Sequence, residues 1–202
     1  TKGRGRSPQN WAIILGSKSF EISLFKISNN IDDGDVIISR SFSYKLNDNI
    51  QTSYYKVSML YAEMMYQIIK NPSLIKKAKP QPKNAFYYPQ RIIEDSFVDW
   101  KLPKFFIINL CKAISKPYPG LRCLFKKETI LMYECNDFDD KIDGIPGYIS
   151  EVFYTGQFII NCVNGRILIN KYENISSKNW FPKKGMILEG KSFYNQMVKI
   201  IE

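Results

Sequence analysis

The sequence predicts an α/β segment followed by a small antiparallel β-domain, and three observations support this fold class. A long amphipathic helix follows two short apolar segments in the first half. A lysine- and proline-rich stretch at 76–85, KKAKPQPKNA, shows no apolar periodicity and predicts a surface connector. The second half contains Asn164-Gly165 between two apolar segments, which is a strong hairpin signal. We therefore predict two domains, residues 1–95 and 96–202.

Each element is predicted from its apolar pattern and its end signals. Ser7 is expected to cap the first helix and Pro8 to occupy its first position. Alternating β-branched segments predict strands, and the β-domain is expected to be a small barrel or sandwich. In chain order, the predicted elements are a helix from Pro8 ended by Gly16, strands at 20–27 and 36–38, a helix at 52–70 ended near Asn71, a helix at 105–116, strands at 121–125, 129–134 and 149–154, a hairpin of 157–163 and 166–172, and a helix at 192–201.

The composition excludes several classes of protein. The chain has 202 residues, of which 45% are hydrophobic and 24% charged, as in ordinary globular proteins and unlike disordered or collagen-like chains. No run of eighteen apolar residues is present, so no membrane span is expected. The four cysteines form no CxxC pair, which argues against a zinc or thioredoxin-like centre. We expect a reduced, cytoplasmic protein.

The chain contains no histidine. This absence removes the commonest general base and metal ligand, so any chemistry must use carboxylates or a base from outside these residues. The net charge of +10 is spread over both halves and favours a solvated basic surface over a dedicated nucleic-acid groove. Because the sequence starts at Thr1 and enters a basic, glycine-containing loop at once, we expect it to be a fragment whose beginning is missing.

An acidic turn is the one candidate for catalysis in the first half. Asp32, Asp33 and Asp35 cluster around Gly34 between two apolar strands, where ligand sites of α/β sheets gather. The spacing lacks the final glutamate of a calcium-binding EF-hand. Taken alone, such a turn is more often a solvated loop than a site.

Together with its neighbours, the turn resembles the folate-dependent formyltransferase family. In that family a basic RG-x-x-P segment opens a helix and a D-x-G turn follows, and both occur here in KGRGRSPQNW and IDDGD. RIIEDSFVDW at 91–100 and KPYPGLRCLF at 116–125 are similar to the family's bridge into its C-terminal domain. The resemblance implies the C-terminal part of a Rossmann-like formyltransferase domain followed by a small OB-like β-barrel.

The resemblance also implies roles for individual residues. Asp32 matches the family's catalytic aspartate, which acts beside an Asn-x-His pair on the formyl carbon of 10-formyltetrahydrofolate; Asp33 and Asp35 are weaker candidates. Tyr87 and Arg91 are expected to meet the acceptor, and no metal is expected. Trp100 is expected to be a core residue at the domain junction. The expected cofactor contacts are Arg6 and the backbone of Ser28, Asn29, Asn30, Ile31 and Asp32.

Three functions remain open. Within the family, the pattern is closest to domains that formylate a UDP-linked 4-amino-arabinose, and an amino-sugar nucleotide is the first expected acceptor. Methionyl-tRNA is the second. The third is a non-catalytic nucleic-acid-binding barrel that uses Lys126, Lys127, Arg166, Lys171 and Tyr172. Since the Asn-x-His pair is not in this sequence, we expect no formyl transfer by these residues alone.

Overall fold

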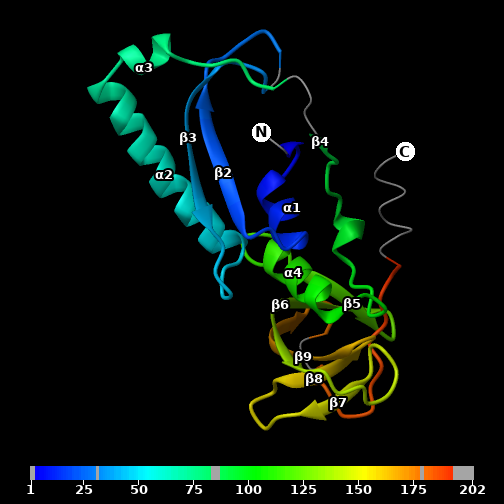
Figure 1. Cartoon of the computed structure of the whole chain (residues 1–202). Helices are drawn as coiled ribbons and strands as arrows, with labels where there is room; N and C mark the ends of the chain where they lie inside the picture. The colour runs from blue at the N-terminus through cyan, green and yellow to red at the C-terminus, as the bar shows by residue number, and fades with distance from the viewer. Residues whose placement is uncertain (1–2, 31, 83–86, 178–179, 193–202) are drawn as a thin grey trace. The chain divides into compact units, whose positions relative to one another are not determined.

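The computed structural model describes residues 3–30, 32–82, 87–177 and 180–192 (Figure 1). The chain divides into two compact units: unit 1 comprises 1–12 and 17–90, and unit 2 comprises 13–16 and 91–202. The main division between the units falls after residue 90, whereas the sequence analysis placed the domain boundary after residue 95. The predicted mixture of helices and sheet is confirmed, and each unit is described by itself below.

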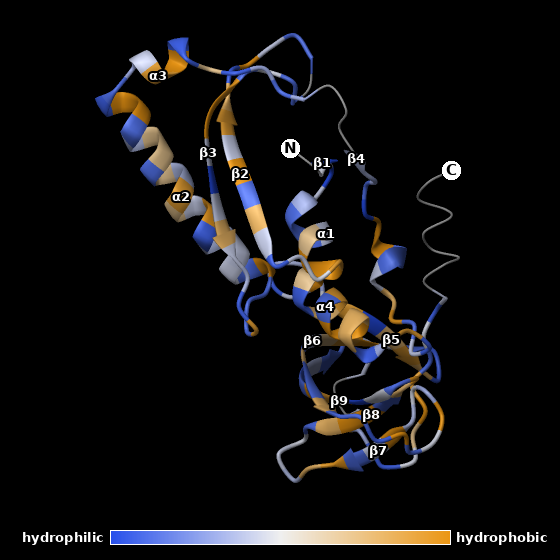
Figure 2. Cartoon of the chain, in the orientation of Figure 1, coloured by the Kyte–Doolittle hydropathy of each residue, from blue (hydrophilic) through white to orange (hydrophobic). Residues whose placement is uncertain are grey.

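Unit 1 is built on an antiparallel strand pair covered by a long helix (Figure 1). Strand β2 spans Ser19–Phe25 and β3 spans Val36–Ser43, with Glu21 opposite Ser41. β3 extends well beyond the predicted 36–38, because its serine-rich end continues the ladder with β2. Figure 2 shows β2 alternating between hydrophobic and hydrophilic residues, as expected of a strand with one covered face.

Helix α2 spans Ile50–Lys70 and supplies the core of unit 1. It begins two residues before the predicted Thr52, because Asn49 is the N-cap and exchanges hydrogen bonds with Thr52 in a capping box. Asn71 is the C-cap, close to the predicted end. Val57 and Met64 of α2 are buried with Ile22 of β2, which confirms that one face of the helix packs on the strands.

Three short elements and the first part of helix α1, whose last two residues are assigned to unit 2, complete unit 1. Helix α1 begins at the predicted Pro8, and Gly16 follows it with a positive φ of 66°. β1 and β4 form a parallel pair in which Arg4 lies opposite Tyr87. A Cβ on Gly5 would lie 2.6 Å from the carbonyl oxygen of Tyr88, so this close pairing requires glycine. The bounds are Arg4–Gly5 for β1, Pro8–Ile14 for α1, Ser73–Lys76 for α3 and Tyr87–Tyr88 for β4.

Unit 2 is a five-stranded antiparallel sheet with helix α4, Lys104–Ile114, against β6 (Figure 1). Its core is dense: Ile107, Leu110, Met132, Phe158 and others are almost fully buried. Trp100 is buried, as expected of a core residue. In spatial order the strands are β5 (Leu121–Phe125), β6 (Glu128–Asp139), β9 (Gly165–Asn174), β8 (Phe158–Cys162) and β7 (Ile149–Val152), and a short 3-10 helix, η1, spans Ile93–Ser96.

The strands in the described part of the chain do not form the expected closed barrel or a Rossmann-like sheet. The sheet of unit 2 is open, with β5 and β7 at its edges. The segment 185–189 makes backbone hydrogen bonds with both edges, at Leu124 (2.7 and 2.9 Å) and at Ile149 (2.8 and 3.0 Å). Unit 1 contains one antiparallel and one parallel strand pair among its described residues, and no larger parallel sheet.

The predicted hairpin of β8 and β9 is present, but its turn lies one residue earlier than expected. Cys162 pairs with Gly165, so Val163 and Asn164 are the central residues. The side chain of Asn164 accepts a hydrogen bond from the backbone N–H of Lys104 (2.8 Å), at the first residue of α4. Asn164 is thus a turn residue, as the sequence predicted, and its side chain also satisfies a helix terminus.

The remaining expectations concern the cysteines, membrane-spanning helices and the C-terminal helix. The four cysteines are buried and unpaired. In the part of the chain that the structure describes, no helix is long and apolar enough to cross a membrane. The predicted helix at 192–201 lies, apart from Ser192, outside the described residues.

Candidate active site in the acidic loop

The acidic turn forms a loop between β2 and β3 that its own backbone closes. The N–H of Lys26 donates to the carbonyl of Asp35 over 2.9 Å. A Cβ on Gly34 would lie 1.7 Å from the carbonyl oxygen of Lys26, so no other residue fits there without moving the chain. The loop is therefore a defined turn of the D-x-G type.

Two of the three aspartates are engaged within the loop. The Asp33 carboxylate accepts hydrogen bonds from the hydroxyl of Ser28 and from the Asn30 amide (2.7 Å). These bonds favour the ionised form and lower the pKa of Asp33. Asp35 forms an ion pair of 3.6 Å with Lys26.

Asp32 is presented differently. It is exposed, and its φ of +57° places it in the left-handed region, which a non-glycine residue rarely adopts. Among the described residues, its carboxylate has no hydrogen-bond or ion-pair partner. Of the three acids, Asp32 is thus the one whose carboxylate is available to a ligand.

Gln81 and Arg4 hold the loop in place, and the sequence analysis missed both. The Gln81 side-chain amide donates to the carbonyls of Asp32 (3.1 Å) and Gly34 (2.7 Å). Arg4 in turn donates to the Gln81 carbonyl oxygen over 2.6 Å. Gln81 comes from the stretch interpreted as a connector, and no local sequence signal marks a residue that acts 47 positions away.

The other expected site residues of unit 1 are solvent-accessible. The side chain of Arg6 is exposed, and its backbone N–H donates to Tyr88 (3.4 Å). Tyr87 is 54% exposed, and its hydroxyl accepts a hydrogen bond of 3.5 Å from Arg4. Ser28, Asn29 and Asn30 are exposed along the loop, and the expected contact at Ile31 lies outside the described residues.

Arg91 belongs to unit 2, where its guanidinium is committed to Asp95. Both side chains are almost buried, with exposed fractions of 10% and 2%. Burial raises the pKa of the Asp95 carboxyl, and the nearby guanidinium opposes that rise. Asp95 also accepts from the backbone N–H of Ile92 (3.0 Å), so the pair organises the start of η1.

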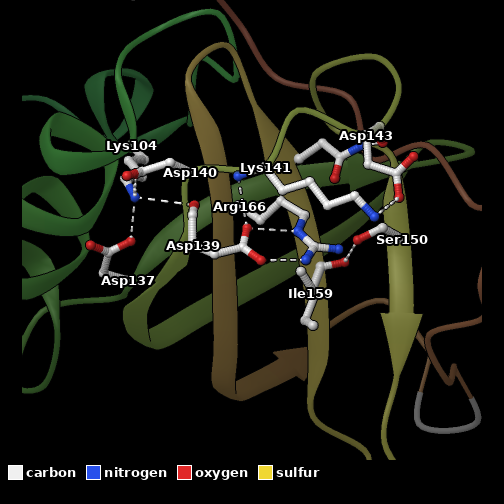
Figure 3. Close-up of polar contacts among 10 residues, drawn as sticks. Lys104, Asp137, Asp139, Asp140, Lys141, Asp143, Ser150, Ile159 and Arg166 are labelled. Atoms are coloured by element: carbon white, nitrogen blue, oxygen red, sulfur yellow. Dashed lines mark hydrogen bonds and ion pairs between the residues drawn. The ribbon is translucent and has the colours of Figure 1, made fainter.

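A second aspartate-rich segment lies at the end of β6 in unit 2 and continues into the residues that follow (Figure 3). The Lys104 ammonium contacts Asp137 (2.6 Å) and Asp140 (2.5 Å), and the Arg166 guanidinium makes two hydrogen bonds to Asp139. These partners lower the pKa of Asp139 and raise that of Lys104. No group of side chains in the described residues is arranged to hold a metal ion.

The five residues of the nucleic-acid-binding hypothesis divide into two sets. Arg166 is paired with Asp139, Lys171 lies 3.1 Å from Glu134, and Tyr172 packs against Phe158 and Trp180. Lys126 and Lys127 are exposed at the turn between β5 and β6.

Comparisons with known proteins identify similar domains, sequences and structures. Residues 92–184 match the family model described as formyl transferase, C-terminal domain. A methionyl-tRNA formyltransferase from Caldanaerobacter subterraneus is 26% identical over 179 residues, which are 88% of this chain and 57% of that protein. HypX from Aquifex aeolicus in complex with tetrahydrofolic acid is similar over 86% of this chain and 30% of its own, with 21% identity and a TM-score of 0.66. An N-formyltransferase from Helicobacter canadensis, solved with folinic acid and dTDP-3-aminofucose, is similar over 85% of this chain and 62% of its own, with 21% identity and a TM-score of 0.63.

These comparisons confirm the resemblance to the folate-dependent formyltransferases that the sequence analysis stated. Residues 92–184 contain the formyl transferase C-terminal domain, and 179 residues of the chain are homologous to a methionyl-tRNA formyltransferase. The chain spans about 57% of the length of that curated relative.

Proposed function

We propose that the protein to which these residues belong transfers a formyl group from 10-formyltetrahydrofolate to an amine. The observation that supports this most is Asp32, whose carboxylate is exposed and unpaired among the described residues, in a D-x-G loop fixed by Gln81 and Gly34. The sequence has no histidine, so the histidine general base that the resemblance implies would have to come from outside these 202 residues. We therefore expect residues 1–202 to be inactive without the rest of that protein.

The cosubstrate supplies the formyl carbon when it is bound. An attacking amine must lose a proton, and the Asp32 carboxylate would stabilise the positive charge of the base that receives it. The backbone of Ser28, Asn29 and Asn30 offers donors and acceptors suited to a heterocycle edge. Arg6 is exposed beside β1 and would meet a polar group of the same ligand.

The proposal also covers the type of each domain and the location of the protein. The segment 185–189 makes backbone hydrogen bonds with both edge strands of the open sheet of unit 2, which supports a partly open, OB-like arrangement of these strands. For unit 1, the strand pairs would be the C-terminal part of a Rossmann-like sheet. Four buried, unpaired cysteines favour a reducing, cytoplasmic location.

We propose an amino sugar linked to a nucleotide as the acceptor. The exposed ring of Tyr87, near Arg4, would stack on a ring of such a substrate. Arg91 is a weaker candidate for phosphate contact, because Asp95 already occupies its guanidinium. Methionyl-tRNA is the second candidate acceptor, and the similarity to a methionyl-tRNA formyltransferase favours it.

The test is an assay of the full-length protein, with and without Asp32→Asn. We expect Asp32→Asn to reduce formylation by roughly 10²–10⁴-fold, the usual contribution of a positioned acid–base group. Glu21→Gln, an exposed carboxylate on β2, is the matched control and should leave the rate unchanged. An equal rate for Asp32→Asn and the parent would remove Asp32 from the mechanism, and a large loss for Asp35→Asn alone would move the role to Asp35.

Salt dependence separates the two acceptors. Binding of tRNA should weaken steeply with salt because many phosphate contacts release counterions, whereas a sugar nucleotide should show a shallow slope. We expect activity on an amino-sugar nucleotide at low and high salt. Activity on methionyl-tRNA without activity on any amino-sugar nucleotide would reverse the order of the two candidates.

A further inference from the structure

Unit 2 carries a groove of about 560 Å³ between the β5–β6 turn and the segment 183–189. This volume lies within the range of about 300–1,000 Å³ that is typical of small-molecule sites. Three lysines lie beside apolar side chains in the lining. These residues are Phe125, Lys126, Lys183, Lys184, Met186 and Ile187.

The turn at one side of the groove is strained. Phe125 pairs with Glu128, so Lys126 and Lys127 are the two central residues of a tight hairpin. Their φ values are +47° and +72°, a region that costs a non-glycine residue roughly 1–2 kcal/mol. Asn-Gly would fill these positions at lower cost. Strain of this kind is typical of functional sites, so the two lysines require an explanation other than folding.

The charge of the groove is positive. No ion pair engages Lys126 or Lys183 within the described ranges, and Lys184 has only an exposed contact of 3.0 Å with Glu151. Glu189 is the single acidic residue of the lining. The Lys126 ammonium lies 5.4 Å from the centre of the Phe125 ring, so a cation and an apolar wall adjoin.

We propose that this groove binds a nucleoside di- or triphosphate. The lysine ammonium groups would contact the phosphate chain, and Phe125 and Ile187 would cover the base or ribose. A polynucleotide fits less well, because it needs a basic track that follows its backbone. Two cations of β9, Arg166 and Lys171, lie opposite the later part of β6, away from the β5–β6 turn, and are already paired with Asp139 and Glu134. The inference rests on unit 2 alone and does not depend on formyl transfer.

Calorimetric titration of the 202-residue chain tests this site with UDP, ATP, inorganic tripolyphosphate, uridine and a ten-nucleotide RNA. We expect UDP or ATP to bind at least threefold more tightly than tripolyphosphate, uridine or the RNA. Lys183→Gln/Lys184→Gln should weaken nucleotide binding by about tenfold, as expected when charge-assisted phosphate contacts are lost. Lys101→Gln, an exposed lysine of unit 2 outside the groove lining, is the matched control.

A second variant separates function from folding. Lys126→Asn/Lys127→Gly gives the turn its preferred residues, so it should raise the thermal midpoint and still weaken nucleotide binding by about tenfold. Neither variant changes unit 1, so nucleotide bound there would be unaffected. The proposal is overturned if no nucleotide binds, if both groove variants bind as the parent does, or if RNA, tripolyphosphate or uridine binds as tightly as the nucleotides.

Discussion

Two aspartate-rich loops, one in each unit, use their carboxylates in opposite ways. In unit 2, the acids at and after the end of β6 are neutralised by Lys104 and Arg166, which come from distant parts of the chain (Figure 3). In unit 1, the loop organises itself through Asp33 and leaves Asp32 exposed. The acidic pattern is similar in both, so the presence of distant cations decides whether such a loop is structural or available to a ligand.

Both loops depend on one glycine for a close backbone approach. A Cβ on Gly34 would lie 1.7 Å from the Lys26 carbonyl oxygen, and a Cβ on Gly165 would lie 2.5 Å from that of Asp139. Close backbone packing is thus common to the two loops and does not separate the candidate site from the structural one. What separates the two loops is whether all of their carboxylates are paired with cations.

The largest expected effect comes from comparing Asp32→Asn with Asp139→Asn. The first variant should change the rate and not the stability, and the second should change the stability and not the rate. In the full-length protein, Asp32→Asn should reduce formyl transfer by roughly 10²–10⁴-fold without a change in the thermal midpoint. Asp139→Asn should lower the midpoint, because it weakens the two hydrogen bonds from Arg166, and should leave the rate unchanged. Rate assays and thermal denaturation of both variants check this.

If both substitutions changed stability and neither changed the rate, the two loops would be equivalent. The proposed distinction between a free and a neutralised acid would then be wrong.

Gln81→Ala should have the next largest effect. It removes the donor to the carbonyls of Asp32 and Gly34, so the loop loses its anchor while all three acids remain. Since misplacement of a catalytic group by about 1 Å can cost about 10²-fold, we expect a rate loss of up to that size. Gln51→Ala, an exposed residue of α2, is the control. A parental rate for Gln81→Ala would show that the loop is held without this amide.

Local patterns predicted most elements of the fold. The apolar repeat in 52–70 identified α2, and alternating segments identified the strand pair of unit 1 and all five strands of unit 2. The errors are at ends and turns. The turn of the β8–β9 hairpin lies one residue earlier than expected, and the side chain of its residue Asn164 accepts a hydrogen bond from the N-terminus of α4, 60 residues away.

The candidate site was only partly predictable for the same reason. The three aspartates stand out in the sequence, but which of them is free depends on Ser28 and Asn30 within the loop. Gln81 lies in a proline-rich stretch whose composition indicates only a connector. The partner of Arg91 follows four residues later, but its burial depends on tertiary packing. Contacts between distant segments leave no periodic signal in the sequence.

Gly165→Ala tests how much the close backbone approach in the loop of unit 2 contributes to stability. The added Cβ would meet the Asp139 carbonyl oxygen, and we expect a loss of about 1–3 kcal/mol in the free energy of unfolding, as for other overpacked sites. Gly185→Ala is the matched control, because Gly185 also has a positive φ, of 94°, but no atom lies within 4 Å of the added Cβ. Chemical denaturation of both variants measures the difference. Equal losses would attribute the whole effect to backbone strain and none to the contact at Asp139.

The smallest effect concerns the pKa of Asp33. The Ser28 hydroxyl is the main cause of its lowered pKa, so Ser28→Ala should move that pKa back toward the ordinary aspartate value of about 3.9. Because the folded-state pKa is lowered, the stability that Asp33 contributes is present above the ordinary value and is lost as the pH falls through the lowered one. In Ser28→Ala this loss should begin at a higher pH, which carboxyl NMR titration of both proteins measures. Ser23→Ala, whose hydroxyl is bonded to Ser39 and not to a carboxylate, should leave the Asp33 titration unchanged. An unchanged pKa in Ser28→Ala would mean that the loop of unit 1 does not organise itself through Asp33, and the contrast with the cation-neutralised loop of unit 2 would lose its physical basis.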